Sequence, residues 1–447
     1  MSGESMKTTP EVIFEKGMNG SENYRIPSLI RTQKGTLIAA ADDRRDKDGD
    51  NPNHINKVIR RSTDNGDTWE AIETIVEFPG YSSDGAAGCD PAMVEDKETG
   101  TIWMIYNHTP GGIGLFTSRP GTGYDANGYK MILDQSGMTY LLKEDGYLYR
   151  KDGVKTDILV KENGDVLREG KRLLGNIYLT LGPYLETKTS FLQAVKSDDD
   201  GVTWSKPIDL NSQVKEEWMR FIGAGPGVGV QIQSGKYKGR LVFPIYFCHS
   251  EGRYLLSCCV IYSDDHGVTW RRGASPNDGR IFEGQAIHSE TLLDHAGMLT
   301  ESQLIDHNDG TLEVFMRNHS DHKCVARCTS HDGGETWGEI WFDETLVDPT
   351  CQHSVIKYPD LGDGKERLIF SNVAHDSKRE NGVVRLSEDG GKTWPYSKVL
   401  ETGSFIYSCL TELPDQQVGI LYEVEYFDPH YDVKLYYTKF NLAWLKE

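Results

Sequence analysis

The hydrophobic pattern of the chain consists of short apolar segments separated by polar turns. Two examples are residues 240–247 (RLVFPIYF) and 254–263 (YLLSCCVIYS), in which β-branched and aromatic residues dominate. Segments of about 5–10 residues with this composition are typical of β-strands. Almost no stretch shows the 3.6-residue period of an amphipathic helix. The pattern therefore predicts an all-β fold whose strands follow one another in meander order.

One turn sequence, S-x-D-x-G-x-T-W, occurs five times along the chain. The copies start at Ser62, Ser197, Ser263, Ser330 and Ser387. Carboxylate and hydroxyl oxygens can accept hydrogen bonds from backbone N–H groups in a turn, glycine permits positive φ, and tryptophan can pack against a neighbouring sheet. A turn that repeats along a chain indicates a repeated sheet, and we predict a β-propeller of four-stranded blades. Five copies, together with strands that lack a copy, favour six blades.

The region between the first two copies has a different character. The spacing between these copies is about twice that between the later ones. Residues 112–187 contain short β segments that alternate with KEDG, RKDG and KENGD turns. We therefore predict a small β-rich domain at 112–187, inserted between early blades. Residues 1–111 and 188–447 then form the propeller.

The charge of the chain restricts its partners. The 447 residues include 48 Lys and Arg against 68 Asp and Glu, which gives a formal charge of -20 at pH 7. A field of this sign repels nucleic acid and anionic membrane surfaces, so we expect neither as a partner. An acidic substrate would need a pocket that is locally basic. No run of about eighteen apolar residues is present, and we therefore expect no membrane span.

The cysteines and the first residues bear on metal binding and location. Eight cysteines are scattered without the paired spacing of a zinc site. We expect them to be small core residues, without a disulfide framework or a metal. The first residues, MSGESMKTTPEV, lack the apolar core of a secretory signal.

Three arginines occur at comparable places in their repeats: Arg25 in YRIP, Arg317 in VFMRN and Arg379 in HDSKREN. A propeller brings the ends of equivalent strands together around its axis. Three guanidinium groups in such positions could bind one carboxylate, because guanidinium is always charged and binds carboxylates in a bidentate manner. The sequence thus supplies a candidate for the locally basic pocket.

Several segments resemble the bacterial exo-α-sialidases, the neuraminidase family of glycoside hydrolases. They are YRIP (24–27), the five repeated turns, residues 300–318 (TESQLIDHNDGTLEVFMRN) and residues 407–423 (YSCLTELPDQQVGILYE). The resemblance covers about residues 10–111 and 188–445 and identifies the repeated turns as Asp boxes. It implies that the three arginines hold the carboxylate of sialic acid, that Tyr407 is the nucleophile, and that Glu301 is its general base.

The chemistry of a sialoside agrees with these roles. The anomeric carbon bears a carboxylate, which would repel an anionic nucleophile but not a neutral phenol. Sialidases with a tyrosine nucleophile are a known exception to the rule of two carboxylates in glycosidases. A phenol needs a base, and Glu301 is implied to supply it.

The acid/base residue is expected in the polar loop that follows residue 43. Three aspartates share this loop: Asp46, Asp48 and Asp50. The resemblance implies Asp50, because its spacings from Arg25 and Arg44 are those of the family. It also implies that Arg44 and Asp90 contact the sugar hydroxyl at C4 and that residues 221–230 contribute a wall of the pocket.

We therefore expect a retaining exo-α-sialidase that removes terminal sialic acid through a tyrosine-linked intermediate, without metal or cofactor. Its expected substrates are sialylated glycoproteins, glycolipids or oligosaccharides. The Asp-box aspartates should be structural and should lie at the end of each blade opposite the site. They are Asp64, Asp199, Asp265, Asp332 and Asp389.

Two alternatives remain open at this stage. One is an intramolecular trans-sialidase, which releases an anhydro sialic acid and places a bulky aromatic residue near the leaving group. We favour hydrolysis because the strand after Tyr407 carries Tyr422, Tyr426 and Phe427 but no tryptophan before Trp444. The other is a non-catalytic sialoglycan-binding propeller, which would not need the pair Glu301 and Tyr407. Location is also open, because the substrate class favours export whereas the unpaired cysteines and the first residues permit a cytoplasmic enzyme.

Overall fold

Nearly all of the regular secondary structure is β-strand. The computed structural model describes residues 4–249 and 254–447. Its helical segments are short: α1 (Asn211–Val214), α2 (Leu442–Lys446) and the 3₁₀ turns Met18–Gly20, Ser82–Asp84 and His295–Gly297. In these two described ranges, no helix is long and apolar enough to cross a membrane. The all-β class predicted from the strand-like pattern is confirmed.

The largest sheet has nine strands and comes mainly from the first half of the chain. Its path runs β16-β15-β7-β6-β4-β3-β2, with β5 added at β4 and β18 at β6. A single parallel pair, Ile55 with Ala87, joins the β2–β5 part to the part that contains β6 and β7. The strands are β2 (Asn23–Arg31), β3 (Leu37–Arg44), β4 (Ile55–Ser62), β5 (Glu73–Val76), β6 (Ala87–Glu95), β7 (Ile102–Thr109), β15 (Phe191–Ser197), β16 (Ile208–Asp209) and β18 (Gly227–Val228).

Three further antiparallel sheets follow in chain order. The first contains β17 (Ile222–Ala224), β19 (Val230–Gln231), β20 (Leu241–Cys248), β21 (Leu256–Ser263) and β22 (Arg271–Arg272). The second contains β25 (Leu299–Asp306), β26 (Leu312–Asn318), β27 (Cys324–Ser330) and β28 (Trp341–Val347). The third contains β29 (Ser354–Tyr358), β30 (Arg367–Val373), β31 (Glu380–Ser387) and β32 (Tyr396–Ser404). A small hairpin, β23 (Ile281–Phe282) with β24 (Gln285–Ala286), precedes β25.

The last sheet joins the two ends of the chain. It contains β33 (Ser408–Leu413), β34 (Gln417–Tyr426) and β35 (Asp432–Asn441), and β1 (Glu11–Phe14) pairs with β35. Ile13 and Phe14 are fully buried in the core cluster that this sheet shares with β2 and β3. Because its outer strand comes from the other end of the chain, this sheet holds residues near both termini in one hydrogen-bonded unit.

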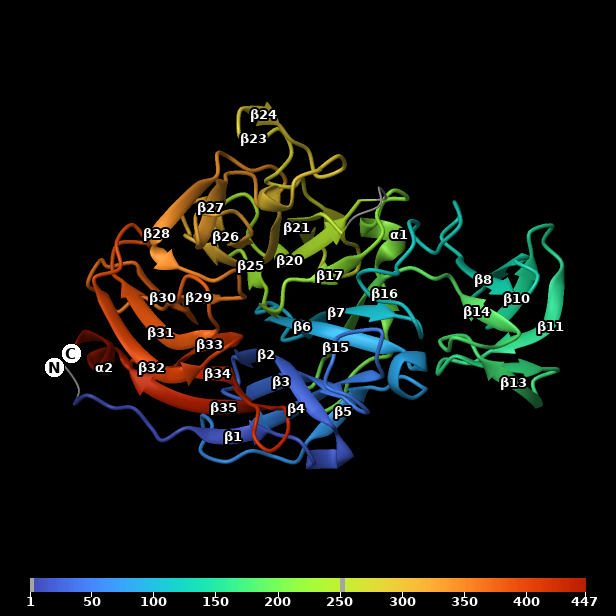
Figure 1. Cartoon of the computed structure of the whole chain (residues 1–447), viewed down its shortest axis with the longest axis horizontal. Helices are drawn as coiled ribbons and strands as arrows, with labels where there is room; N and C mark the ends of the chain where they lie inside the picture. The colour runs from blue at the N-terminus through green and yellow to red at the C-terminus, as the bar shows by residue number, and fades with distance from the viewer. Residues whose placement is uncertain (1–3, 250–253) are drawn as a thin grey trace.

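The sheets are arranged around a common centre, as in a propeller (Figure 1). The strands nearest this centre, here called the first strands, contact one another: β2 lies against β6 and β33, and β29 lies against β25 and β33. The hydrophobic core fills the spaces between neighbouring sheets. All eight cysteines are buried in these layers without a disulfide. This propeller-like arrangement was predicted from the repeated turns.

A seven-stranded sheet lies apart from the others (Figure 1). Its order is β13-β12-β11-β10-β9-β8-β14, and it has its own core of residues such as Ile132, Leu148 and Ile158. In sequence it separates β7 from β15, yet these two strands pair along all of β15. Its strands are β8 (Lys130–Asp134), β9 (Thr139–Leu142), β10 (Tyr147–Arg150), β11 (Lys155–Val160), β12 (Asp165–Arg168), β13 (Arg172–Asn176) and β14 (Tyr184–Glu186).

Strand direction separates the two ends of each sheet. The start of β2 pairs with the end of β3, since Asn23 lies opposite Arg44, and the first Asp box follows β4 at the other end. The other boxes likewise begin at the ends of β15, β21, β27 and β31. The start of β2, the end of β3 and the start of β4 therefore lie at one end of the molecule. The equivalent strand ends of the other sheets lie there too. The Asp boxes lie at the opposite end.

Each Asp box is held by the same side-chain bonds. In the last box, Asp389 Oδ1 accepts from the backbone N–H of Thr393 at 2.9 Å and Oδ2 accepts from its hydroxyl at 2.6 Å. Ser387 Oγ donates to Asp389 at 2.8 Å and accepts from the N–H of Gly391 at 2.8 Å. Comparable bonds from Thr68 lower the pKa of Asp64 to about 2. The carboxylate thus closes the turn in its ionised form.

Replacing Asp389 by alanine should lower the melting temperature without changing the Michaelis constant of the folded protein. Asp389 and Thr393 are exposed, so water can replace part of the lost bonding, and we expect a cost of only ~0.5–1.5 kcal/mol. Calorimetry and steady-state kinetics on Asp389→Ala measure the two quantities. Glu344→Ala, at an exposed carboxylate on β28, is the control. A raised Michaelis constant at unchanged stability would place the box in the site.

Candidate active site

Three first strands begin with a β-bulge, and each bulge carries a predicted site residue. The register shifts between Arg25 and Ser28, between Cys89 and Ala92, and between Leu299 and Ser302. Arg25, Asp90 and Glu301 lie in or beside these irregular steps. A bulge re-aims side chains that a regular strand would point at a neighbouring sheet, and bulges are common next to active sites. The three bulges lie at the same end of their sheets.

Tyr407 and Glu301 form the centre of the site. Tyr407 immediately precedes β33, and its hydroxyl donates to Glu301 Oε1 at 2.6 Å. Arg317, at the end of β26, donates from Nη1 to Glu301 Oε2 at 2.7 Å and to the Tyr407 hydroxyl oxygen at 3.1 Å. Both Tyr407 and Glu301 are buried. A phenol whose proton faces a buried carboxylate has the geometry of a nucleophile with its base.

The phenol of Tyr407 is neutral in this setting. Burial raises the pKa of Tyr407 well above its ordinary value, and the negative charge of Glu301 adds to this rise. Arg317 and Arg379 oppose the rise but do not outweigh it. The phenol is therefore an uncharged group that can become a nucleophile when Glu301 accepts its proton.

The three predicted arginines surround the phenol. The guanidinium carbon of Arg25 lies 5.4 Å from the centre of the Tyr407 ring, and that of Arg379 lies 6.0 Å from it. Arg317 bonds the hydroxyl directly. The structure thus brings together the triad that the sequence predicted from three separate motifs. In a chain of formal charge -20, this cluster is a locally basic region suited to a carboxylate.

Glu423, on β34, was not predicted as a site residue. Its fully buried carboxylate accepts from Arg25 Nε at 2.8 Å and Nη2 at 3.2 Å. It also accepts from the backbone N–H groups of Ile26, at 2.5 Å, and Tyr407, at 3.1 Å. Ile26 has φ 66°, a conformation that costs energy for a β-branched residue and persists only where surrounding contacts hold it. One carboxylate therefore fixes an arginine of the triad, the strained bulge and the backbone of Tyr407.

The loop after β3 presents Asp50 to the site. Arg44 Nη2 donates to Asp50 Oδ1 at 2.6 Å, and Arg44 Nη1 donates to the carbonyl of Asp48 at 2.8 Å. Asp46 lies elsewhere, because its carboxylate accepts from the N–H of Ser82 at 2.8 Å and contacts the His54 ring at 3.2 Å. The Asp50 side chain is 78% exposed. Of the three loop aspartates, Asp50 is the one whose carboxylate is paired with Arg44.

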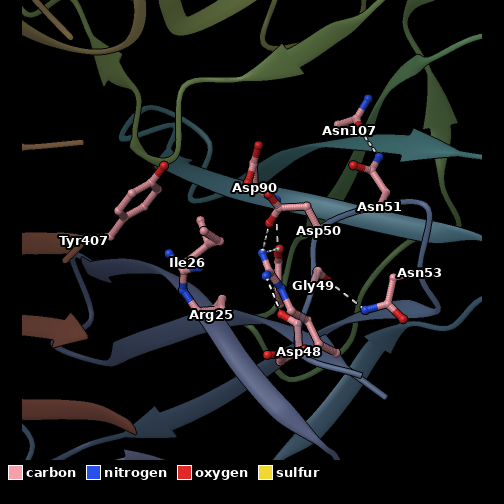
Figure 2. Close-up of polar contacts among 12 residues, drawn as sticks. Arg25, Ile26, Asp48, Gly49, Asp50, Asn51, Asn53, Asp90, Asn107 and Tyr407 are labelled. Carbon is pink, nitrogen blue, oxygen red and sulfur yellow. Dashed lines mark hydrogen bonds and ion pairs between the residues drawn. The ribbon is translucent and has the colours of Figure 1, made fainter. Parts of the chain in front are cut away.

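Asp90, near the start of β6, lies close to Asp50 (Figure 2). It has φ 61°, and its Oδ2 accepts from the Tyr246 hydroxyl at 2.9 Å. Burial raises the pKa of Asp90 well above its ordinary value, with a further contribution from Asp42. Phe221 stacks on Tyr246 with ring centres 5.8 Å apart. The segment expected to form a wall of the pocket therefore contacts the partner of Asp90.

A separate cavity of about 670 Å³ opens at the other end of the first strands. Its lining includes Arg31, Asp306 and Glu412, which follow the site residues along β2, β25 and β33. It contains none of the predicted catalytic or substrate-binding side chains, although Val228, Gly229 and Val230 of the expected wall segment line it. In the described ranges, no group of three or more His, Cys, Asp and Glu side chains is placed to hold a metal ion.

Comparisons with known proteins agree with the geometry. Residues 175–420 match the family described as "BNR repeat-like domain", a range that includes the last four Asp boxes. The chain belongs to this family. The anhydrosialidase of Macrobdella decora is 31% identical over 479 residues, covering 93% of this chain and 60% of that protein. The sialidase of Micromonospora viridifaciens is 30% identical over 458 residues, covering 99% of this chain and 55% of that protein.

The chain thus spans less than two thirds of the length of these two relatives. Among solved structures, the intramolecular trans-sialidase of Ruminococcus gnavus, in complex with oseltamivir carboxylate, has a TM-score of 0.82 and 29% identity. The match covers 97% of this chain and 98% of that one. The resemblance to bacterial sialidases predicted from the sequence motifs is confirmed.

Asp50 should titrate below the ordinary aspartate value of 3.8 in the unliganded protein. The Arg44 guanidinium is the main cause of this lowered pKa, with smaller contributions from Arg25 and Arg379. A cation stabilises the ionised form, so Arg44→Gln should move the titration to higher pH. The ¹³C resonance of labelled aspartate carboxyl groups, assigned by its loss in Asp50→Asn, measures this. A titration that stays in place in Arg44→Gln would contradict the pairing.

Proposed function

We propose that the protein is a retaining exo-α-sialidase that removes terminal sialic acid from glycoproteins, glycolipids or oligosaccharides. The observation that carries this proposal is the hydrogen bond from Tyr407 to Glu301 beneath three arginines. A carboxylate bound by Arg25, Arg317 and Arg379 would place the adjacent anomeric carbon close to a neutral phenol. Terminal sialic acid has this carboxylate next to its anomeric carbon.

The first step transfers the sugar to the protein. Asp50 gives its proton to the glycosidic oxygen as the bond to the leaving group breaks. The Tyr407 oxygen bonds the anomeric carbon while its proton passes to Glu301. The three arginines hold the substrate carboxylate throughout, and Arg44 and Asp90 are assigned to the C4 hydroxyl.

The second step releases the sugar. Asp50, now ionised, takes a proton from water, whose oxygen bonds the anomeric carbon as the bond to Tyr407 breaks. Glu301 returns its proton to the phenol, and the configuration is retained because two displacements have occurred. No residue in this scheme requires a metal or a cofactor.

The low pKa of free Asp50 is compatible with its role as an acid. The substrate carboxylate would offset the positive charge of the arginines, and the leaving group would cover the exposed Asp50 side chain. Both changes favour the neutral form of a carboxyl group and raise its pKa. Asp50 would thus gain its proton when substrate binds.

We assign hydrolysis, with the anhydro product of an intramolecular trans-sialidase as the second candidate. Trp444 packs on Phe440 with ring centres 5.1 Å apart, after the end of β35, at the end away from the site. The aromatic residues at the site end of this sheet include Tyr426, Phe427 and Tyr431, and Phe427 is exposed. An exposed phenylalanine leaves room for water, which favours hydrolysis. The similarity to an anhydrosialidase is the observation that supports the anhydro product as the second candidate.

We also assign six blades to the propeller and a separate inserted domain at residues 112–187. The support is the strand order, in which successive groups of four strands each begin with a strand near the centre. These groups are β2–β5, β6 with β7, β15 and β16, β17 with β20–β22, β25–β28, β29–β32 and β33–β35 with β1. The seven-stranded sheet with its own core supports the inserted domain.

Tyr407→Phe should reduce turnover of a fluorogenic sialoside by at least about a thousandfold, because the residue loses the oxygen that bonds the sugar. Tyr422→Phe, at a buried phenol that lies opposite Ser408 on the neighbouring strand β34, is the control. Mass analysis of the sugar released by the wild-type protein separates hydrolysis from anhydro product by one water. Wild-type turnover in Tyr407→Phe would refute the nucleophile. Binding of a sialoglycan without any released sugar would favour the non-catalytic alternative.

A further inference from the structure

The position of Asp50 depends on contacts made by its neighbours, since its own side chain is mostly exposed. Arg44 bonds its carboxylate and the carbonyl of Asp48. Asn53 Nδ2 donates to the carbonyls of Lys47 at 2.9 Å and Gly49 at 2.8 Å, which closes the loop on itself. These contacts shape the loop but do not attach it to β7.

Asn51 supplies that attachment. Its Nδ2 donates to Asn107 Oδ1 at 3.1 Å (Figure 2). It also donates to Thr109 Oγ1 at 2.9 Å, and both acceptors lie near the end of β7. Asn107 and Thr109 are two positions apart on one strand and therefore share a face. Both are fully buried. The residue next to Asp50 is thus held by two side chains at the end of β7.

Asn107 cannot turn its amide away from Asn51 without losing other bonds. Its Nδ2 donates to Ser190 Oγ at 2.5 Å and to the carbonyl of Ile222 at 2.7 Å. The carbonyl of Ile222 accepts but cannot donate, so the NH₂ group must face it and Oδ1 must face Asn51. The Asn107 Oδ1 atom that accepts from Asn51 is therefore fixed by contacts with Ser190, just before β15, and with Ile222 on β17.

The backbone beside Asn51 is also confined. A Cβ atom at Gly114 would lie 2.2 Å from the carbonyl oxygen of Asn51, so only glycine permits this approach. The loop is packed on one side by residue 114 and bonded on the other by β7. A general acid works only within hydrogen-bond reach of the leaving oxygen, and a misplacement of about 1 Å can cost a hundredfold in rate.

We propose that Asn51, Asn107 and Thr109 form a latch that positions Asp50 for proton transfer to the leaving group, an inference that rests on the proposed sialidase function. Asn107 and Thr109 are positioning residues, since they touch the substrate only through the loop. Loosening the latch would leave the arginine triad, Glu301 and Tyr407 in place. It would impair the one step that needs a correctly placed proton donor.

The choice of substrate tests this role. A sialyl-lactose substrate has a poor leaving group that needs a proton, whereas a 4-nitrophenyl sialoside has a good leaving group that does not. Asn107→Ala should lower kcat/KM for sialyl-lactose by about ten- to a hundredfold. For the nitrophenyl substrate the loss should be less than about threefold. Asp50→Ala should show the same contrast with a larger ratio, because a general acid contributes about 10²–10⁴.

Asn277→Ala is the matched control, since Asn277 is an equally buried amide away from the site. Its Nδ2 donates to Ser257 Oγ on β21 and to the carbonyl of Gly297. It should change both substrates by the same factor. Thr109→Val keeps the volume of the side chain and removes one acceptor, so it serves if Asn107→Ala does not fold. It should give the same contrast at a smaller ratio.

Equal losses on both substrates in Asn107→Ala or Thr109→Val, or no loss on either, would overturn the latch. If Asp50→Ala shows the contrast and the latch variants do not, the sialidase function stands and the latch fails. If the wild-type protein cleaves neither substrate, the proposed function fails and the latch fails with it.

Discussion

The site depends on one hydrogen bond, from the Tyr407 hydroxyl to Glu301. Burial keeps the phenol neutral, and the Glu301 carboxylate is placed to accept its proton. Arg317 bonds both groups, so the carboxylate that we propose as the base is also half of an ion pair. Removing Glu301 would leave the partly buried Arg317 guanidinium without a carboxylate partner, which is costly. Chemistry and local stability are therefore coupled at this point of the fold.

The sheets assemble this bond from distant parts of the sequence. Tyr407 precedes one first strand, Glu301 lies in the bulge of another, and Arg317 ends a second strand. Antiparallel order places all three at one end of the molecule and the Asp boxes at the other. One end of the molecule therefore carries the closed turns, and the other end carries the cluster of charged side chains. Glu423 does both at the site, because its carboxylate pairs with the charge of Arg25 and also accepts hydrogen bonds from backbone N–H groups.

Much of this could be predicted from sequence, for identifiable reasons. The Asp boxes are local motifs whose bonds span at most four residues, so their turns follow from residue type. Arg25, Arg317, Glu301 and Tyr407 lie in segments that resemble a family. Contacts between distant segments could not be predicted in this way. Glu423 lies within a segment that resembled the family, yet its pairing with Arg25 across 398 residues becomes visible only when β2 meets β34.

The same limit applies to the loop that carries Asp50, the proposed acid. Three aspartates share this loop and cannot be told apart by residue type. Only the fold shows that Asp46 contacts Ser82 and His54 and not Arg44. The positive φ of Ile26 runs against the preference of a β-branched residue. Asn51 and Asn107 carry no motif at all. Strain and buried amide contacts depend on the neighbours that the fold supplies, and no local pattern records them.

The account is tested most directly by trapping the covalent intermediate. A sialosyl fluoride that also carries fluorine at C3 has a fast leaving group, while the added fluorine slows the release step, so the intermediate should accumulate. The protein would be digested after incubation and its peptides measured by tandem mass spectrometry. We predict one added fluorosialyl group, located on Tyr407. A label on Glu301 or Asp50, or cleavage of sialosides without any label on Tyr407, would contradict the mechanism.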